Sequence, residues 1–343
     1  MKQILPTVFF IMLQTVVLAQ SAFHNLGNVH IYEDANVGIH TNLINNGDFV
    51  STSGLVGLYN EETITVSGTK KPVFYDLEVM TGKQVALQTP VVVTNTHNFV
   101  EGNVVTDKAN PEVYLEFKGN SIHIGENDRS HVNGCVSVSK SSDFSFPIGD
   151  GERMREISIE GNTEENTYAA AYFYTSPEVN GTNDFKEEGL AGVSKKEYWK
   201  LKGKGKIVVT LTWDKMSDVV NMTNSINNLS VVGWSKSEKQ WVNLGNFRVS
   251  GDLFRGSVTS ESFIPNDFSV ITIGVKSGIF KNISNVSSTS EVVKVNIFDV
   301  AGNLVGTVNK DENLDLRIYA KGIYILDMKM SDGKRLVKKV LNK

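Results

Sequence analysis

The chain has 343 residues, of which 21% are charged, and its formal net charge is −4 at pH 7. This length accommodates about two or three domains. The small net charge implies no strong electrostatic partner, and we expect no binding to nucleic acid. The one cysteine, Cys135, excludes an intrachain disulfide. It lies in a predicted strand from Val132 to Val138, without the His and Asp or Asn arrangement of a thiol nucleophile. We therefore interpret Cys135 as a packing residue.

Residues 1–19 have the pattern of a secretory signal peptide. Lys2 supplies the positive charge, an apolar run extends from Ile4 to Leu18, and small residues follow from Ala19. The apolar run is too short and too broken for a stable transmembrane span. No second run of spanning length occurs in the sequence, so we predict export with cleavage near Ala19 and no membrane span.

Residues 20–135 contain many short apolar segments separated by polar turns. The turns include Asn-Asn-Gly, Ser-Gly-Thr and Thr-Gly-Lys, and no window has a helical period. Such spacing is typical of either a parallel β-solenoid or an open β-sandwich. The segments that begin at Phe74 and at Val91 resemble each other, which favours a solenoid-like region.

A distinctive stretch follows at residues 127–156. It contains His131-Val132-Asn133-Gly134 and then Phe144-Ser145-Phe146-Pro147-Ile148-Gly149-Asp150. This stretch resembles one found in large secreted and surface proteins of the Bacteroidetes. Gly149-Asp150-Gly151 lacks the lysine of a phosphate-binding loop and the acidic ladder of a calcium loop. We predict a tight turn at a strand junction.

The strands lengthen in residues 136–277. Ile207, Val209, Leu211 and Trp213 share one face of a predicted strand. Roughly seven or eight such strands, separated by turn signals, predict an immunoglobulin-like β-sandwich. Residues 278–290 are rich in serine and asparagine and are predicted to form a polar linker.

Residues 291–343 read as a small antiparallel β-sandwich. Val293, Val295 and Ile297 alternate with polar residues, and Gly302 permits a turn. A strand is predicted from Ile323 to Met330. Asp332-Gly333 is a strong hairpin signal before the last strand, which includes Leu336 and Val340. This last strand is basic, but its charges alternate with apolar residues, so they form the solvated side of a strand.

This last module resembles the C-terminal sorting domain of type IX secretion cargo in the Bacteroidetes. The resemblance rests on residues 295–305, on residues 314–326 and on the basic tail 334–343. One departure is Tyr319, where a leucine is commoner in such domains. The resemblance implies export by the type IX secretion machinery to the cell surface or medium. It also implies sorting residues that act in turn geometry and recognition: Gly302, Gly322, Tyr324, Gly333, Lys338 and Lys339.

No motif in the chain predicts catalysis, a cofactor or a metal. The six histidines lack metal-ligand spacing, and no nucleophile elbow or nucleotide fingerprint occurs. Glycoside hydrolysis requires two carboxylates at a set separation. Asp150, Glu152 and Glu160 are candidates, but the sequence does not establish how far apart they lie.

The four tryptophans pose a further question, because an exposed row of rings can stack on sugars. Trp199, Trp213, Trp234 and Trp241 all lie in predicted strands, where packing in the core is the commoner role. We expect an all-β, adhesin-like binding or structural protein without enzymatic activity, whose partner is a surface glycan or a host or matrix ligand. The alternative is a carbohydrate-binding or carbohydrate-active protein, which requires a groove lined by carboxylates or by exposed tryptophan. A tryptophan ring exposed beside a concave surface would distinguish the two.

Overall fold

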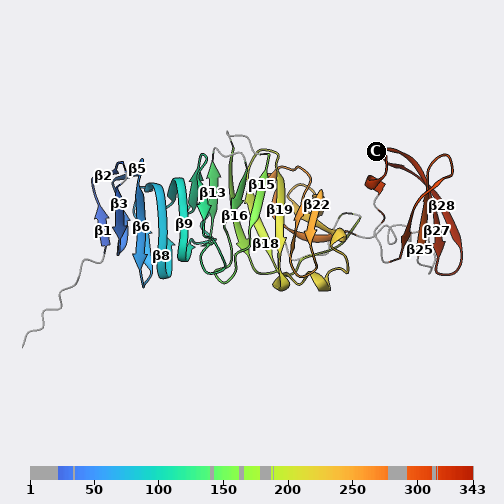
Figure 1. The fold of residues 1–343 in the computed structure, drawn as a ribbon, viewed down its shortest axis with the longest axis horizontal. Helices are drawn as coiled ribbons and strands as arrows, with labels where there is room; N and C mark the ends of the chain where they lie inside the picture. Colours follow the sequence, from blue (N-terminus) through green and yellow to red (C-terminus); the bar gives the residue numbers. More distant parts are fainter. Residues whose placement is uncertain are drawn as a thin grey trace, which may run out of the picture.

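A computed structural model describes residues 22–33, 35–139, 143–161, 166–177, 187, 189–276, 292–310, 314 and 316–342. Within these residues the protein is all-β, as predicted, with a few single-turn 3-10 helices (Figure 1). The predicted signal peptide 1–19 and the predicted linker 278–290 lie outside the described residues.

The first part is a parallel β-solenoid with three columns of stacked strands, which confirms the expectation from spacing. β1 stacks on β4 and β4 on β7; β2 stacks on β5, and β3 on β6. The long strand β8 bends through all three columns and pairs along its length with β9. The strands are β1 (Ala22–Asn25), β2 (Asn28–Ile31), β3 (Asn36–Ile39), β4 (Asn42–Asn45), β5 (Asp48–Ser51), β6 (Leu55–Asn60), β7 (Ile64–Ser67), β8 (Val73–Leu87), β9 (Val91–Val105), β10 (Leu115–Lys118), β11 (Ile122–Ile124), β12 (Val132–Asn133) and β13 (Val136–Ser139).

Alternation within each short strand places one set of side chains inside the solenoid. Phe49 and Phe74 come from neighbouring rungs and meet edge to face, with ring centroids 5.4 Å apart. At a corner, the buried Asn25 side chain donates a hydrogen bond to Asn45 Oδ1 at 2.8 Å. Gly47 stacks tightly beneath Gly27, because a Cβ at Gly47 would lie 1.9 Å from the Gly27 carbonyl oxygen. The Asn-Asn-Gly signal in the sequence is therefore a solenoid corner.

The solenoid continues into the second part without a break in hydrogen bonding. β13 pairs in parallel with β10 on one side and antiparallel with β16 on the other. The sheet then extends through β18, β24, β20 and β21, and β17 pairs with β24. These strands are β16 (Thr167–Phe173), β17 (Leu190–Val193), β18 (Tyr198–Lys202), β20 (Leu229–Ser235), β21 (Trp241–Asn243) and β24 (Phe268–Lys276).

A second, five-stranded antiparallel sheet shares its core with this one. Its order is β14-β15-β19-β23-β22. Its strands are β14 (Phe144–Phe146), β15 (Ile157–Glu160), β19 (Val208–Trp213), β22 (Arg248–Gly251) and β23 (Gly256–Thr259). The single-turn helices of this part are η1 (Lys215–Ser217), η2 (Val219–Asn221), η3 (Ile226–Asn228) and η4 (Pro265–Asp267). The immunoglobulin-like topology itself stays a prediction.

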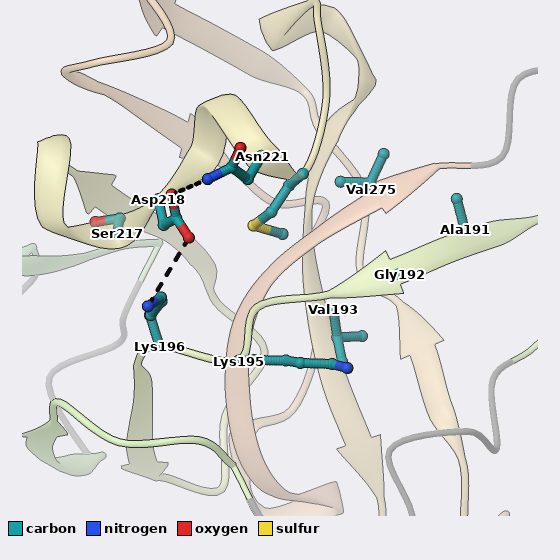
Figure 2. Close-up of a pocket in the computed structure, with 10 residues that line it drawn as sticks. Ala191, Gly192, Val193, Lys195, Lys196, Ser217, Asp218, Asn221 and Val275 are labelled. Atoms are coloured by element: carbon teal, nitrogen blue, oxygen red, sulfur yellow. Dashed lines mark hydrogen bonds and ion pairs between the residues drawn. The ribbon is translucent and has the colours of Figure 1, made fainter.

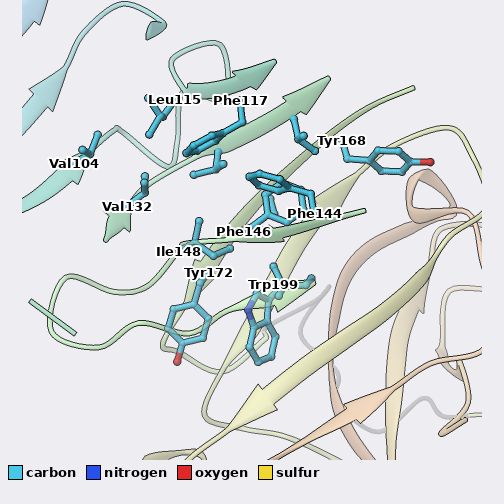
Figure 3. Close-up of a cluster of buried hydrophobic side chains, with 14 of the residues drawn as sticks. Val104, Leu115, Phe117, Val132, Phe144, Phe146, Ile148, Tyr168, Tyr172 and Trp199 are labelled. Atoms are coloured by element: carbon cyan, nitrogen blue, oxygen red, sulfur yellow. The ribbon is translucent and has the colours of Figure 1, made fainter. Parts of the chain in front are cut away.

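One hydrophobic core spans both parts, from Ile31 to Val275. Figure 3 shows the place where the solenoid interior meets the core between the two sheets. There the Phe144 ring lies 5.1 Å from the ring of Phe117 and 5.0 Å from that of Phe146, measured between centroids. Because aromatic contacts cross the junction, residues 22–276 pack as one body, which is elongated in Figure 1.

The C-terminal residues form a separate core on one four-stranded antiparallel sheet, ordered β26-β25-β27-β28. The strands are β25 (Val292–Phe298), β26 (Leu304–Asn309), β27 (Gly322–Met330) and β28 (Arg335–Asn342), with η5 (Leu316–Ile318) before β27. The sequence predicted these strands correctly but as a small sandwich. Among the described residues there is one sheet, and its apolar face is covered by Leu314, Leu316 and Tyr319 instead of a second sheet.

Candidate functional site

Three of the six predicted sorting residues lie at one end of the C-terminal sheet. Gly302 occupies the turn after β25, with a φ of +85° that favours glycine. The register pairs Phe298 with Ile325, so this turn lies at the end of the sheet where β27 begins with Gly322. Tyr324 follows two residues later. The predicted residues Gly302, Gly322 and Tyr324 therefore gather near the end of β28.

Tyr324 links this end of the sheet to the covering segment. Its side chain is buried, and its hydroxyl donates a hydrogen bond to the Ala320 carbonyl at 2.7 Å. Its ring lies 5.8 Å from that of Tyr319. The hydroxyl of Tyr319 occupies space left by Gly306, where a Cβ would lie only 1.9 Å away. The departure at Tyr319 is thus accommodated by a glycine on β26.

The remaining predicted residues do not join this group. Gly333 lies in the β27–β28 turn at the opposite end of the sheet, with a φ of +86°. Lys338 and Lys339 are both exposed on β28. Because neighbouring residues of a strand point to opposite faces, the two ammonium groups do not form a single patch.

The two glycines Gly333 and Gly322 make a matched test of turn geometry against recognition. The substitution Gly333→Ala is expected to destabilise the sorting domain by about 1–2 kcal/mol, because an L-residue is strained at positive φ. Ala at Gly322 meets no atom within 4 Å and needs no positive φ, so stability should not change. Thermal unfolding of the two variants, with surface export measured in parallel, checks both. Export lost in Gly322→Ala without a loss of stability indicates recognition, whereas normal export in this variant means that recognition does not depend on the glycine.

All four tryptophans are buried, so they do not form an exposed row that could stack on sugars. Trp199 and Trp241 are 0% exposed, Trp213 is 1% and Trp234 is 2%. Two of them also use the indole N–H inside the fold: Trp199 donates to the Arg155 carbonyl and Trp213 to that of Asp252. They were correctly interpreted as packing residues, since a buried aromatic contributes a large apolar area.

Two histidines and the cysteine are packed inside the fold. His97 lies in the solenoid interior, 4.0 Å from the Phe99 ring, and burial lowers its pKa to about 3. His131 Nε2 accepts a hydrogen bond from the Gly151 N–H, and burial lowers the pKa of this imidazole too. Cys135 is buried at 7% exposure. Across the described ranges, no three His, Cys, Asp or Glu side chains lie close enough together to hold a metal ion.

The Gly149-Asp150-Gly151 turn lies where the solenoid meets the two-sheet part of the body. The Asn103 amide of β9 donates to the Gly151 carbonyl at 2.8 Å. Asp150 accepts hydrogen bonds from the backbone N–H groups of Glu152 and Arg153. The tight turn that the sequence predicts is present, and its carboxylate is fully engaged.

A cluster of charges extends from this turn into the core. We call it the junction cluster: Asp150, Arg153, Arg155, Tyr172, Glu197 and Asp214. Arg155 is 4% exposed and Glu197 is 0% exposed, and their Nε and Oε2 atoms are 3.3 Å apart. Arg155 also pairs with Asp214 at 2.6 Å, and Arg153 joins Asp214 to Asp150.

The pKa values within the junction cluster follow from burial and pairing. Burial raises the pKa of Glu197, and the Arg155 guanidinium only partly opposes this. Burial works in the same direction on Asp214, but Arg155 and Arg153 outweigh it and leave the pKa lowered. The Tyr172 hydroxyl donates to Glu197 Oε2 at 2.7 Å. This cluster was not predicted from the sequence, in which two arginines close behind a Gly-Asp-Gly turn were the available signal.

The described residues of the body line hollows, of which two bear on function. The first, of about 330 Å³, is shown in Figure 2 and lies between β17, η1–η2 and the end of β24. Its one carboxylate, Asp218, accepts a hydrogen bond from Asn221 at 2.6 Å and pairs with Lys196 at 3.8 Å. A single neutralised carboxylate does not provide the acid and base pair of a hydrolase.

The second hollow, of about 210 Å³, lies on the outer face of the continuous sheet. Lys108, Lys200 and Lys202 surround it, and its floor is made by alanines of β16. No carboxylate is among its lining residues. Nothing in the sequence pattern predicted this hollow, because its residues come from a solenoid loop and from two strands that become neighbours only on folding.

Comparisons with known proteins bear on the C-terminal part. Residues 280–343 match the family of the secretion system C-terminal sorting domain. A search of curated proteins finds no match, and a search of solved structures finds none either. None of the helices in the described part of the chain is long and apolar enough to cross a membrane. The chain therefore carries a C-terminal sorting domain of the type IX secretion system, as in Bacteroidetes cargo, and is exported to the cell surface or the extracellular space.

Proposed function

We propose that residues 22–276 form a non-catalytic, adhesin-like surface module that binds an extracellular ligand, a glycan or a host or matrix component. The observation that carries this is the continuity of the body. One core runs from Ile31 to Val275, and β13 pairs with both the solenoid and the sheet that follows. A rigid, elongated body is suited to presenting a binding surface. The sorting domain has a core of its own, so the body does not depend on it for packing.

The carboxylates support binding over hydrolysis. Asp150 is held by Arg153 and by backbone N–H groups, and Glu160 pairs with Arg248 on the surface. The first hollow has one carboxylate and the second has none among its lining residues. The carbohydrate-active alternative loses its main support, since the tryptophans on which it depended are buried.

Adhesion of cells that display the protein tests this proposal. Cells that produce the full chain are compared with a deletion strain and with cells that display an unrelated folded protein on the same sorting domain. Coated surfaces carry mucin, fibronectin, polygalacturonate, heparin or neutral dextran. More displaying cells than deletion cells should be retained on at least one coating. Equal retention on all coatings despite verified display, or release of soluble fragments from a coating, contradicts the proposal.

A further inference from the structure

We propose that the second hollow binds the carboxylate or sulfate group of one unit of an acidic polysaccharide. This proposal identifies the ligand of the adhesive function proposed above, and it rests on that function. We define the lysine hollow by Lys108, Lys200 and Lys202 around a floor of Ala169 and Ala171, closed at one end by Phe173.

The register of the sheet explains why a hollow forms here. Ala169 of β16 lies beside Lys202 of β18, and Ala171 lies beside Lys200. Two alanines between long side chains leave a depression on the outer face of the sheet. Ala109 and Pro111, from the connection between β9 and β10, also line it. The depression is thus built from both parts of the body.

All three lysines line this depression. Lys108 Nζ lies 5.4 Å from the centre of the Phe173 ring and Lys200 Nζ lies 5.0 Å from it, so one ring holds two cations. Burial raises the pKa of the Cys135 thiol in the wall, while a hydrogen bond with Thr106 and the charges of all three lysines oppose the rise. The charges of all three lysines therefore reach the same lining residue.

The cations are not neutralised within the site. Lys108 Nζ donates a hydrogen bond to the Gly149 carbonyl at 3.1 Å. This bond uses one of the three N–H groups of the ammonium. Burial lowers the pKa of Lys108 to about 8, and Asp150 only partly offsets this. Lys200 and Lys202 are exposed, and in the part of the chain that the structure describes neither has a carboxylate at ion-pair distance. A bound anion would supply the missing charge and hydrogen-bond acceptors.

The volume of the lysine hollow and the residues around it indicate what kind of molecule carries the bound anionic group. A hollow of 210 Å³ is smaller than the roughly 300–1,000 Å³ of sites for drug-sized molecules, so it fits one ring or one charged group. The Phe173 ring stacks on Tyr198 at 4.8 Å with an interplanar angle of 5°, which gives the hollow an apolar end against which the C–H groups of a sugar can pack. Because Lys200 and Lys202 are exposed, the neighbouring units of a polymer can continue along the surface.

Binding of defined polymers to the full-length exported protein tests the proposal. The probes are heparin for sulfate, polygalacturonate for carboxylate and dextran as a neutral polymer. The test variant is Lys200→Gln with Lys202→Gln. The matched control is Lys204→Gln with Lys206→Gln, two exposed lysines on the same chain that do not line the hollow. Both variants lose the same charge, and all four side chains are exposed, so folding should be retained.

We expect at least one acidic polymer to bind and dextran not to bind. The test variant should then bind at least about tenfold more weakly, a difference of about 1.4 kcal/mol, while the control stays within about twofold of the natural protein. Equal weakening of the two variants would mean diffuse attraction to surface lysines and overturns the proposal, as does absence of binding by both acidic polymers. If displayed cells adhere to another coating and keep that adhesion with Lys200→Gln and Lys202→Gln, the lysine hollow is refuted while the proposed adhesive function stands.

Discussion

A chain that ends at Ser290 is expected to accumulate in the periplasm and to be absent from the cell surface and the medium. It keeps the predicted signal peptide but lacks all four strands of the sorting sheet, β25 to β28. Cell fractionation and digestion of intact cells with an external protease measure the outcome. Full-length protein should be cleaved by the protease, and the truncated protein should be protected.

Loss of export in this experiment must be separated from loss of folding. The structure predicts that the truncated body folds, because the core of residues 22–276 and the core of the sorting sheet share no buried residue. The purified truncated protein should therefore melt in a cooperative transition close to that of the same body in the full chain. A folded, truncated protein that still reaches the surface would contradict the role of the last module in sorting.

Replacing Arg155 by Ala is expected to destabilise the body by about 3–5 kcal/mol, the range observed when one partner of a buried ion pair is removed. The variant leaves Glu197, which is 0% exposed, without its guanidinium partner. It also removes the partner that lies 2.6 Å from Asp214. Chemical denaturation of the purified body measures the loss in the free energy of unfolding.

Two further variants show whether the buried charge is the cause. Arg248→Ala breaks an exposed pair with Glu160, whose side chains are 58% and 50% exposed, and should cost no more than about 1 kcal/mol. Adding Glu197→Gln to Arg155→Ala removes the uncompensated carboxylate and should restore part of the stability. If Arg155→Ala costs no more than Arg248→Ala, the buried charges of the junction cluster do not stabilise the body.

The sequence predicted those features that depend on local spacing. Short strands with polar corners indicated a solenoid, and the corner at Gly47 behaves as the turn signal suggested. Strand alternation and the Asp-Gly hairpin in the last module correctly gave the strands of the sorting sheet. These patterns depend on residues within a few positions of each other, so one sequence is enough to recognise them.

Features that depend on which strands become neighbours were not predictable. The alternation in β13 indicates a buried face, but it does not reveal that one edge pairs with β10 and the other with β16. For the same reason the lysine hollow could not be foreseen, since Lys108 and Lys200 are brought together by that pairing. In the sorting module, the pattern could not distinguish a second sheet from the cover that Tyr319 provides.

The direction of the hydrogen bonds in the solenoid bears on how the protein responds to mechanical force. The strands lie across the long axis, so the bonds between rungs run along it (Figure 1). A force applied to the N-terminal end of the solenoid therefore acts on a few of these bonds at a time and detaches the rungs one after another. Each detached rung, such as the 20 residues between Asn25 and Asn45, releases up to about 70 Å of extended chain. The N-terminal rungs would thus detach under tension before the ion pairs of the junction cluster were broken.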